Sequence, residues 1–167
     1  MKTRVMVAAA FVAGFGASSA YAQAPCGDVV TVQVSPTWFP DGKQITTEFQ
    51  SAGIAFQAQD PVQDDIVRNG EFTNPSRINF GAPVTAPVCE VTVTFDDRND
   101  HSQTYKLTAY DKSGRQVAQA TIGDGGLASL PLILTVKAPN FFANIAYVIL
   151  TEQPAGARVL QRVSYKK

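Results

Sequence analysis

The polar run from Asp96 to Ser102 is the densest group of chemistry-bearing side chains in the sequence. Its carboxylates, together with one further along the chain, are oxygen ligands of the kind that Ca²⁺ prefers. The run is not an EF-hand loop, since it lacks the central glycine and the glutamate at the twelfth position. Two hypotheses therefore stay open, a structural Ca²⁺ site or a solvated loop, and no other cofactor is expected. The ligands of the calcium hypothesis are Asp96, Asp97, Asp100 and Asp124.

His101, in the same run, is the only histidine of the chain, so a Ser-His-Asp triad would depend on it. The sequence contains no G-x-S-x-G segment that would present a nucleophilic serine. A glycosidase needs only two carboxylates across a cleft, but no spacing here selects a pair. One histidine and two cysteines do not make a zinc-ligand pattern either. We therefore expect a protein that is not an enzyme.

Aromatic and polar side chains near two loops suggest a different chemistry, the recognition of a carbohydrate. Sugar sites combine an aromatic platform with a few polar groups that fix the orientation of the ligand. The single tryptophan lies in the Pro36 to Gly42 segment, outside the strand-like runs. An alternative for this tryptophan is packing against an edge of the core, and Tyr110 is expected to pack on a hairpin. The residues that we predict to bind a ligand are Trp38, Phe39, Arg98, Asn99 and His101.

The N-terminal segment has the organisation of a secretory signal peptide. Lys2 and Arg4 form a basic start, an apolar run follows, and Ala20 to Ala22 has the A-x-A pattern of a cleavage site. We expect residues 1–22 to be the signal peptide and residues 23–167 to form a single domain. The protein would then be extracytoplasmic, either periplasmic or fully secreted.

Charge and hydropathy disfavour two classes of partner. The chain has 14 basic and 14 acidic residues and no basic stripe of the kind that binds nucleic acid. No apolar run after the signal approaches the roughly 20 residues of a membrane-spanning helix. The partner that we expect is a glycan or another envelope component, and the oligomeric state is left open.

Cys26 and Cys89 are the only cysteines of the chain. In an oxidising compartment such a pair is expected to form a disulfide. A metal or redox pair would need CxxC spacing or neighbouring histidines, and neither is present. We predict a structural bridge that ties the N-terminal segment to the strand beginning near Cys89.

Short runs of alternating apolar and polar residues dominate the remainder of the sequence. Turn residues separate the runs, and the segment from Asp111 to Gly114 is a hairpin signal. Many short strands of this kind predict an all-β protein, an antiparallel β-sandwich. The apolar positions expected to share faces include Val30, Val32 and Val34; Val91, Val93 and Phe95; Tyr105, Leu107 and Ala109; Leu132, Leu134 and Val136; and Ile145, Tyr147 and Ile149.

Four segments follow one another in a familiar order: Arg77 to Val84 (RINFGAPV), Cys89 to Phe95 (CEVTVTF), Tyr105 to Gly114 (YKLTAYDKSG) and Arg162 to Tyr165 (RVSY). This order, over about residues 45–165, resembles bacterial secreted jelly-roll domains of the galactose-binding-like type. The resemblance implies a jelly-roll sandwich and non-catalytic recognition of a carbohydrate or cell-envelope glycan. The alternative is a structural or adhesive envelope or matrix protein that works through protein–protein contacts.

Overall fold

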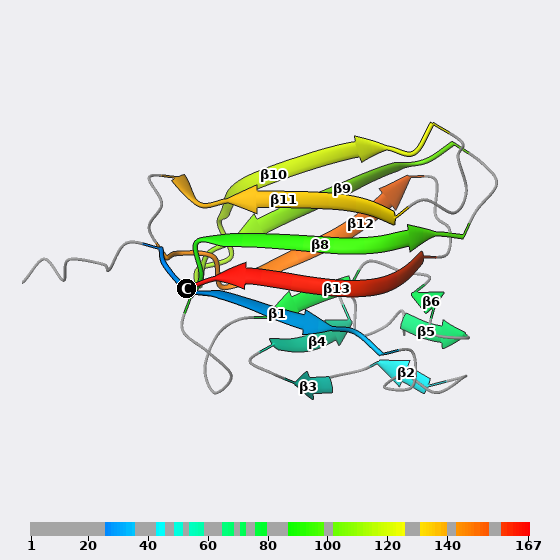
Figure 1. The fold of residues 1–167 in the computed structure, drawn as a ribbon, viewed down its shortest axis with the longest axis horizontal. Helices are drawn as coiled ribbons and strands as arrows, with labels where there is room; N and C mark the ends of the chain where they lie inside the picture. Colours follow the sequence, from blue (N-terminus) through cyan, green and yellow to red (C-terminus); the bar gives the residue numbers. More distant parts are fainter. Residues whose placement is uncertain are drawn as a thin grey trace, which may run out of the picture.

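In the computed structural model the chain forms two antiparallel β-sheets that pack face to face (Figure 1). The structure describes residues 26–35, 43–45, 49–51, 54–58, 65–68, 71–72, 76–79, 87–98, 102–125, 131–139, 143–153 and 158–167. The strands of this part of the chain are β1 (Val29–Gln33), β2 (Lys43–Ile45), β3 (Phe49–Ser51), β4 (Ile54–Ala58), β5 (Asp65–Arg68), β6 (Glu71–Phe72), β7 (Ser76–Asn79), β8 (Glu90–Asp97), β9 (Thr104–Tyr110), β10 (Gln116–Gly123), β11 (Pro131–Lys137), β12 (Tyr147–Gln153) and β13 (Arg158–Lys166). In the same ranges there is no helix long and apolar enough to cross a bilayer.

The strand pairing gives the chain a jelly-roll arrangement. The first sheet, called sheet A here, has the order β11-β8-β13-β6-β5-β2, and β1 also pairs with β13. The second sheet, sheet B, has the order β10-β9-β12-β7-β4-β3. Strands β9 and β10 form a hairpin in sheet B, while their chain neighbours β8 and β11 pair in sheet A. This folded-over double hairpin confirms the antiparallel sandwich and jelly roll that the sequence predicted.

Alternation along the strands fills the space between the two sheets with apolar side chains. The inward residues of β8 and β9 are fully buried, and the rings of Phe95 and Tyr105 meet with centroids 4.7 Å apart. Val32 of β1, Leu134 of β11 and Val163 of β13 belong to the same cluster. The core-facing positions predicted for β1, β8, β9 and β11 are therefore confirmed.

Strand β12 differs from the prediction because it is apolar on both faces. Val148 and Leu150 are fully buried and belong to the core cluster between the sheets. Since side chains alternate along a strand, Tyr147 and Ile149 lie on the outer face of sheet B. The predicted shared face therefore holds for Tyr147 and Ile149, but it is wrong for Ile145, which is fully buried in the core cluster.

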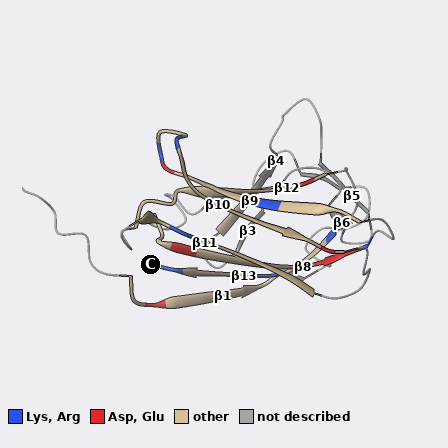
Figure 2. Cartoon of the chain, turned by 90° about the horizontal axis from the view of Figure 1, so that it is seen from above, with Lys and Arg blue, Asp and Glu red and all other residues tan. Residues whose placement is uncertain are grey.

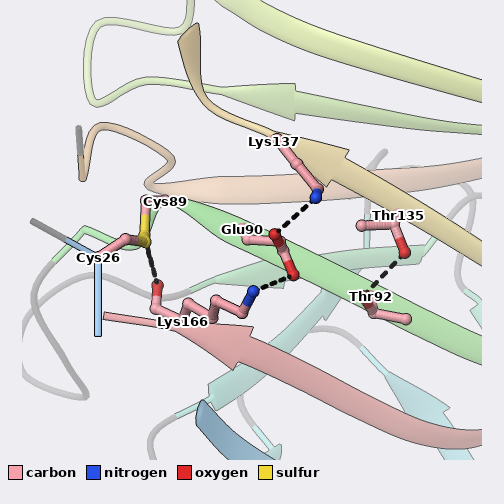
Figure 3. Close-up of polar contacts among 7 residues, drawn as sticks. All are labelled: Cys26, Cys89, Glu90, Thr92, Thr135, Lys137 and Lys166. Carbon is pink, nitrogen blue, oxygen red and sulfur yellow. Dashed lines mark hydrogen bonds and ion pairs between the residues drawn. A yellow bond between two sulfur atoms is a disulfide. The ribbon is translucent and has the colours of Figure 1, made fainter. Parts of the chain in front are cut away.

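A disulfide between Cys26 and Cys89 anchors the start of β1 beside β8 and β13 (Figure 3). The two Cα atoms are 6.2 Å apart, and the predicted bridge is confirmed. Backbone hydrogen bonds support the same junction, from Gly27 N to Lys167 O (3.1 Å) and from Lys167 N to Asp28 O (3.2 Å). The N-terminal segment is therefore held both covalently and by main-chain pairing.

On the outer face of sheet A, polar side chains of neighbouring strands pair with one another (Figure 3). Glu90 accepts one ammonium group at each carboxylate oxygen, from Lys166 at 3.0 Å and from Lys137 at 3.2 Å. Partial burial acts to raise the pKa of Glu90, but the two lysines outweigh it and the net pKa is lowered. On the same face, the hydroxyls of Thr92 and Thr135 are 2.9 Å apart across β8 and β11.

Candidate functional site

The predicted polar loop begins at the end of β8, and the structure describes only its first residues. Asp96 Oδ2 lies 4.0 Å from Arg98 Nη2, and Gln161 Nε2 donates a hydrogen bond to the same oxygen at 2.6 Å. Asp96 is thus held on the outer side of sheet A by the neighbouring strand. The predicted site residues outside the described part of the chain are Trp38, Phe39, Asn99, Asp100 and His101.

Two of the predicted calcium ligands, Asp97 and Asp124, are buried, with 1% and 7% of their surface exposed. Asp97 follows Asp96 along β8 and therefore faces the opposite side of sheet A. Asp124 closes the open end of the β9–β10 hairpin, where its Oδ1 accepts the Gln103 N–H at 2.8 Å. The described residues contain no group of three or more potential metal-ligating side chains. Because Asp100 lies outside them, the calcium site stays a prediction.

A buried ion pair lies at the same end of the sandwich. Arg158 begins β13 in register with Asp97, and no part of its side chain is exposed. Its Nη1 lies 2.7 Å from Glu152 Oε1, and its Nη2 donates to Leu150 O at 3.4 Å. These contacts join β13 of sheet A to β12 of sheet B. The cluster therefore acts as a structural lock between the sheets, away from solvent.

A pair of stacked tyrosines lies at the opposite end of β9, on the outer face of sheet B. Tyr110 ends β9, Tyr147 begins β12, and the two are register partners. Their ring centroids are 5.0 Å apart, and the angle between the two ring planes is only 12°. Both residues are half-buried. Each ring covers one face of the other.

The turn that follows Tyr110 is shaped by a single carboxylate. Asp111 Oδ1 accepts hydrogen bonds from the Ser113 amide (2.9 Å), the Ser113 hydroxyl (2.6 Å) and the Arg115 amide (3.0 Å). Its Oδ2 accepts the Arg115 Nε–H at 3.1 Å. The Ser113 hydroxyl, followed by the Arg115 amide, lowers the pKa of Asp111, which therefore stays ionised. Gly114 has φ +81°, a conformation that favours glycine.

A shallow cavity of about 400 Å³ adjoins this turn, lined by Pro87, Asp111, Lys112, Ser113, Ala143 and Asn144. The turn also lies against the tyrosine pair, since a β-carbon on Gly114 would stand 3.7 Å from the Tyr147 hydroxyl oxygen. Asn144 Oδ1 is buried and has no hydrogen-bond partner among the described residues. We call the two tyrosines, the Asp111 to Arg115 turn and the cavity the tyrosine–hairpin site.

Sheet B continues this site away from the turn. Thr108 and Ile149 follow the tyrosines on the same outer face and are both buried. Lys106 comes next along β9 and is exposed. On the other side of β12 lies β7, where Asn79 is the register partner of Tyr147 and Arg77 is the register partner of Ile149. The aromatic pair thus lies on the sheet itself rather than at an isolated loop, and the burial of Thr108 and Ile149 shows that the outer face next to the pair is covered.

The sequence pattern did not reveal this site. It assigns Tyr110 to hairpin packing and groups Tyr147 with Ile145 and Ile149 on one strand face, because each residue is judged from its immediate neighbours. The hairpin signal does place Tyr110 directly before a turn. The missing information is the pairing of β9 with β12, which brings the two rings together from distant parts of the chain.

No protein-family model matches the chain, and no curated protein is similar to it. Among solved structures, the CBM22-1 xylan-binding domain of Xyn10C from Paenibacillus barcinonensis is similar, with a TM-score of 0.47 and 13% identity. That similarity covers 86% of this chain and 97% of the domain. A structure described as CBM4 gives a TM-score of 0.30 at 11% identity, over 82% of this chain and 81% of that one.

A third similar structure is the arabinose-bound α-L-arabinofuranosidase MgGH51, with a TM-score of 0.35 and 11% identity. The similarity covers 80% of this chain but only 25% of the arabinofuranosidase chain. The assignment of this protein to the jelly-roll sandwiches rests on its own strand pairing.

Proposed function

We propose that this protein is an extracytoplasmic, non-catalytic glycan-binding module and that the glycan contacts the tyrosine–hairpin site. The observation that carries the proposal is the stacked pair of Tyr110 and Tyr147 beside a cavity lined by both polar and apolar residues. The Cys26–Cys89 disulfide and the signal-like N-terminus support an oxidising compartment for this function.

The aromatic pair suits a sugar because a pyranose ring has apolar C–H faces as well as polar hydroxyls. Tyrosine offers both properties, an apolar ring and a hydroxyl group that donates or accepts a hydrogen bond. Since the two rings stack on one another and belong to paired strands, they are ordered before a ligand arrives. A ligand that packs on the Tyr110 ring therefore loses little of its binding free energy to ordering the protein.

Some polar groups that line the cavity already form hydrogen bonds within the protein, and others are available to bond with a ligand. Asp111 is engaged, because its carboxylate accepts four hydrogen bonds within the turn. Asn144 offers an amide whose oxygen is without a partner among the described residues, and Lys112 is exposed. We assign the reading of sugar hydroxyls to Asn144 and Lys112, and the shaping of the turn to Asp111.

The same inventory favours binding over hydrolysis. Glycoside hydrolysis generally uses two carboxyl groups on either side of the scissile bond. Among the residues that line the described cavity, Asp111 is the only acid, and its charge is committed to Arg115 and the turn amides. A module that binds without cleaving is consistent with this arrangement.

Arg98, which the sequence predicts to bind a ligand, marks a second candidate surface. Arg98 lies where β8 ends, and Tyr110 lies at the far end of β9, the next strand along the chain. The two candidate surfaces are therefore at opposite ends of the sandwich, and mutagenesis can separate them. Trp38, Phe39, Asn99 and His101 stay proposed ligand contacts, and Ca²⁺ at the acidic loop stays proposed as well.

The test is isothermal titration calorimetry against a panel of plant and bacterial oligosaccharides, with the wild-type protein and matched variants. We expect Tyr110→Ala and Tyr147→Ala each to weaken binding by about tenfold or more, in line with loss of a central aromatic contact. The control is Ile133→Ala, which removes an exposed apolar side chain from sheet A instead. Binding that survives both tyrosine changes but is lost in Arg98→Ala would move the site to the other end of the sandwich.

The alternative function, that of an adhesive or structural module, would require a different kind of surface. It needs a contiguous apolar patch or an unprotected edge for its partner. Among the described residues, the exposed large hydrophobic side chains are Val29 and Ile133. They lie on β1 and β11, which are separated in sheet A by β13 and β8. The described surface therefore offers the glycan proposal more support than the adhesive one.

A further inference from the structure

Strand β1 forms part of the edge of sheet A. Among the described strands it pairs with β13 alone, in an antiparallel register without a bulge. Figure 2 shows β1 beside β13 at the rim of the sheet, with no charged residue inside the strand. Val29, Thr31 and Gln33 are exposed, and Val29 is accessible over 60% of its surface. The outer side of this strand is therefore open to solvent.

Every second residue of β1 has main-chain groups that point away from β13. In an antiparallel ladder the N–H and C=O of one residue point to the same neighbouring strand, and those of the next residue point to the other side. Val34 N donates to Gln161 O at 2.8 Å, and Asp28 O accepts the Lys167 N–H at 3.2 Å, so the even-numbered positions face β13. The odd-numbered positions therefore face outward. We call their main-chain groups the β1 edge, which consists of the N–H and C=O of Val29, Thr31 and Gln33.

The outermost strands of the two sheets carry features that hinder pairing with another chain, whereas β1 does not. Strand β10, at the edge of sheet B, has a bulge between Gln116 and Ala118. Strand β11, at one edge of sheet A, begins with Pro131 and ends with Lys137, and β2 and β3 are only three residues long. Bulges, prolines, lysines and short strands all oppose edge-to-edge association. The sequence of β1, VVTVQ, lacks these features and has a high β propensity.

We propose that β1 pairs with β1 of a second copy of this chain, in antiparallel orientation about a two-fold axis at Thr31. In this register Thr31 lies opposite the partner's Thr31, and Val29 lies opposite the partner's Gln33. Each group of the β1 edge then has a hydrogen-bond partner, and the interface is self-complementary. A register centred on Val30 or Val32 would instead place Gln33 or Val29 opposite a residue outside β1. Sheet A would thus continue from one copy into the other.

The charges around the β1 edge are compatible with this pairing. The charged residues nearest to it are Asp28, Lys166, Lys167 and Arg162. Lys166 is already paired with Glu90 at 3.0 Å. Asp28 would lie two strands from the partner's Arg162, a separation of about 10 Å, whereas Lys167 would lie three strands from it. The shortest approach between charges of the two copies is therefore attractive, and β1 places no like charges opposite each other.

The size of the contact determines how strong the association is. Pairing through a strand of five residues buries less than the roughly 1,200 Å² of a stable interface. We therefore expect a weak dimer, with a dissociation constant of about 0.1 mM, that separates on dilution. An edge that pairs with its own copy is closed to other strands, so the pairing does not call for an adhesive function. The inference is independent of the proposed glycan binding.

The experiment is sedimentation equilibrium of the purified, disulfide-bonded protein from about 10 µM to about 1 mM, together with a charge swap at the axis. We expect Thr31→Lys and Thr31→Glu each to weaken self-association by about tenfold or more, because like charges would then lie directly opposite each other. An equimolar mixture of the two variants should associate within about threefold of wild type, since lysine then faces glutamate. This rescue requires position 31 to lie opposite itself.

A matched control separates the axis from the rest of the sheet. Ile133→Lys adds a charge at an exposed position of β11, at another edge of sheet A, and should leave the association unchanged. Urea unfolding midpoints of the Thr31 variants should be close to that of wild type, because this residue is exposed.

Three outcomes would overturn the inference or its register. A protein that stays monomeric over the whole concentration range would overturn the inference, and so would a dimer that Thr31→Lys leaves unchanged. Association that both charge variants abolish but their mixture does not restore would overturn the two-fold axis at Thr31. Calorimetry with oligosaccharides tests the proposed function separately, and neither result determines the other.

Discussion

Tyr110 and Tyr147 are held together by the sheet rather than by a loop. Their rings stack with centroids 5.0 Å apart. Ala146, which precedes Tyr147, donates its amide N–H to Tyr110 O at 2.8 Å. Both rings therefore sit on main chain that is fixed by the β9–β12 ladder. A binding surface built in this way keeps its shape when the neighbouring turns move.

The stacking contact should be measurable in stability as well as in binding. In a double-mutant cycle with Tyr110→Ala and Tyr147→Ala, we expect a coupling free energy of about 0.5–1.5 kcal/mol, as for other aromatic pairs. Urea unfolding of the four proteins measures it. Strictly additive effects would show that the rings do not stabilise each other.

The disulfide should contribute a large share of the stability of the domain. Cys26 and Cys89 are separated by 63 residues, and closing a loop of that size stabilises by about 4 kcal/mol in the chain-entropy model. We expect the double variant Cys26→Ala/Cys89→Ala to lose about 2–4 kcal/mol in urea unfolding. Reductant should lower the stability of the wild type to a similar level and leave the variant unchanged. An insensitive wild type would contradict the structural role.

The buried ion pair gives a second stability prediction, at the other end of the sandwich. Removing one partner of such a pair leaves an uncompensated charge, at a cost of about 3–5 kcal/mol. We therefore expect Arg158→Met to be strongly destabilised, because Glu152 would lose its partner at 2.7 Å. Arg162→Met, an exposed change on the same strand, should alter the free energy of unfolding by no more than about 0.5 kcal/mol. Equal effects of the two changes would contradict the structural lock.

Much of the fold could be predicted because strand alternation is a local property. Val91, Val93 and Phe95 are apolar at every second position and polar between, so their shared face follows directly from the sequence. The same rule fails at Tyr147, since the run around it is apolar at consecutive positions and alternation cannot select a face. Whether such a strand turns its tyrosine inward or outward is decided by the neighbouring strands.

The candidate site was less predictable for a related reason. Loop residues such as Arg98 can be proposed as binding residues from their side-chain type alone, without knowledge of the fold. The importance of Tyr110 depends on its register with a strand far along the chain. Likewise, nothing in the pattern around Asp97 and Asp124 distinguishes a solvated carboxylate from a buried one. Their burial follows from the closing of the sandwich over the ends of β8 and β10.

The pairing of Glu90 with Lys137 and Lys166 should make stability depend on pH in the acid range. The pKa of Glu90 in the folded protein lies below its ordinary value of 4.5, so the unfolded chain takes up a proton first as the pH falls. The contribution of Glu90 is therefore fully present at neutral pH and is lost as the pH falls from about 4.5 through the lowered pKa. We expect wild type to exceed Glu90→Gln in urea stability at pH 7 and the gap to close below about pH 4. In the variant Lys137→Gln/Lys166→Gln the effect of Glu90→Gln should be much smaller at every pH, because the cations that lower the pKa are gone. A gap that stays constant from pH 7 to pH 3 would show that the carboxylate charge at this position does not stabilise the fold.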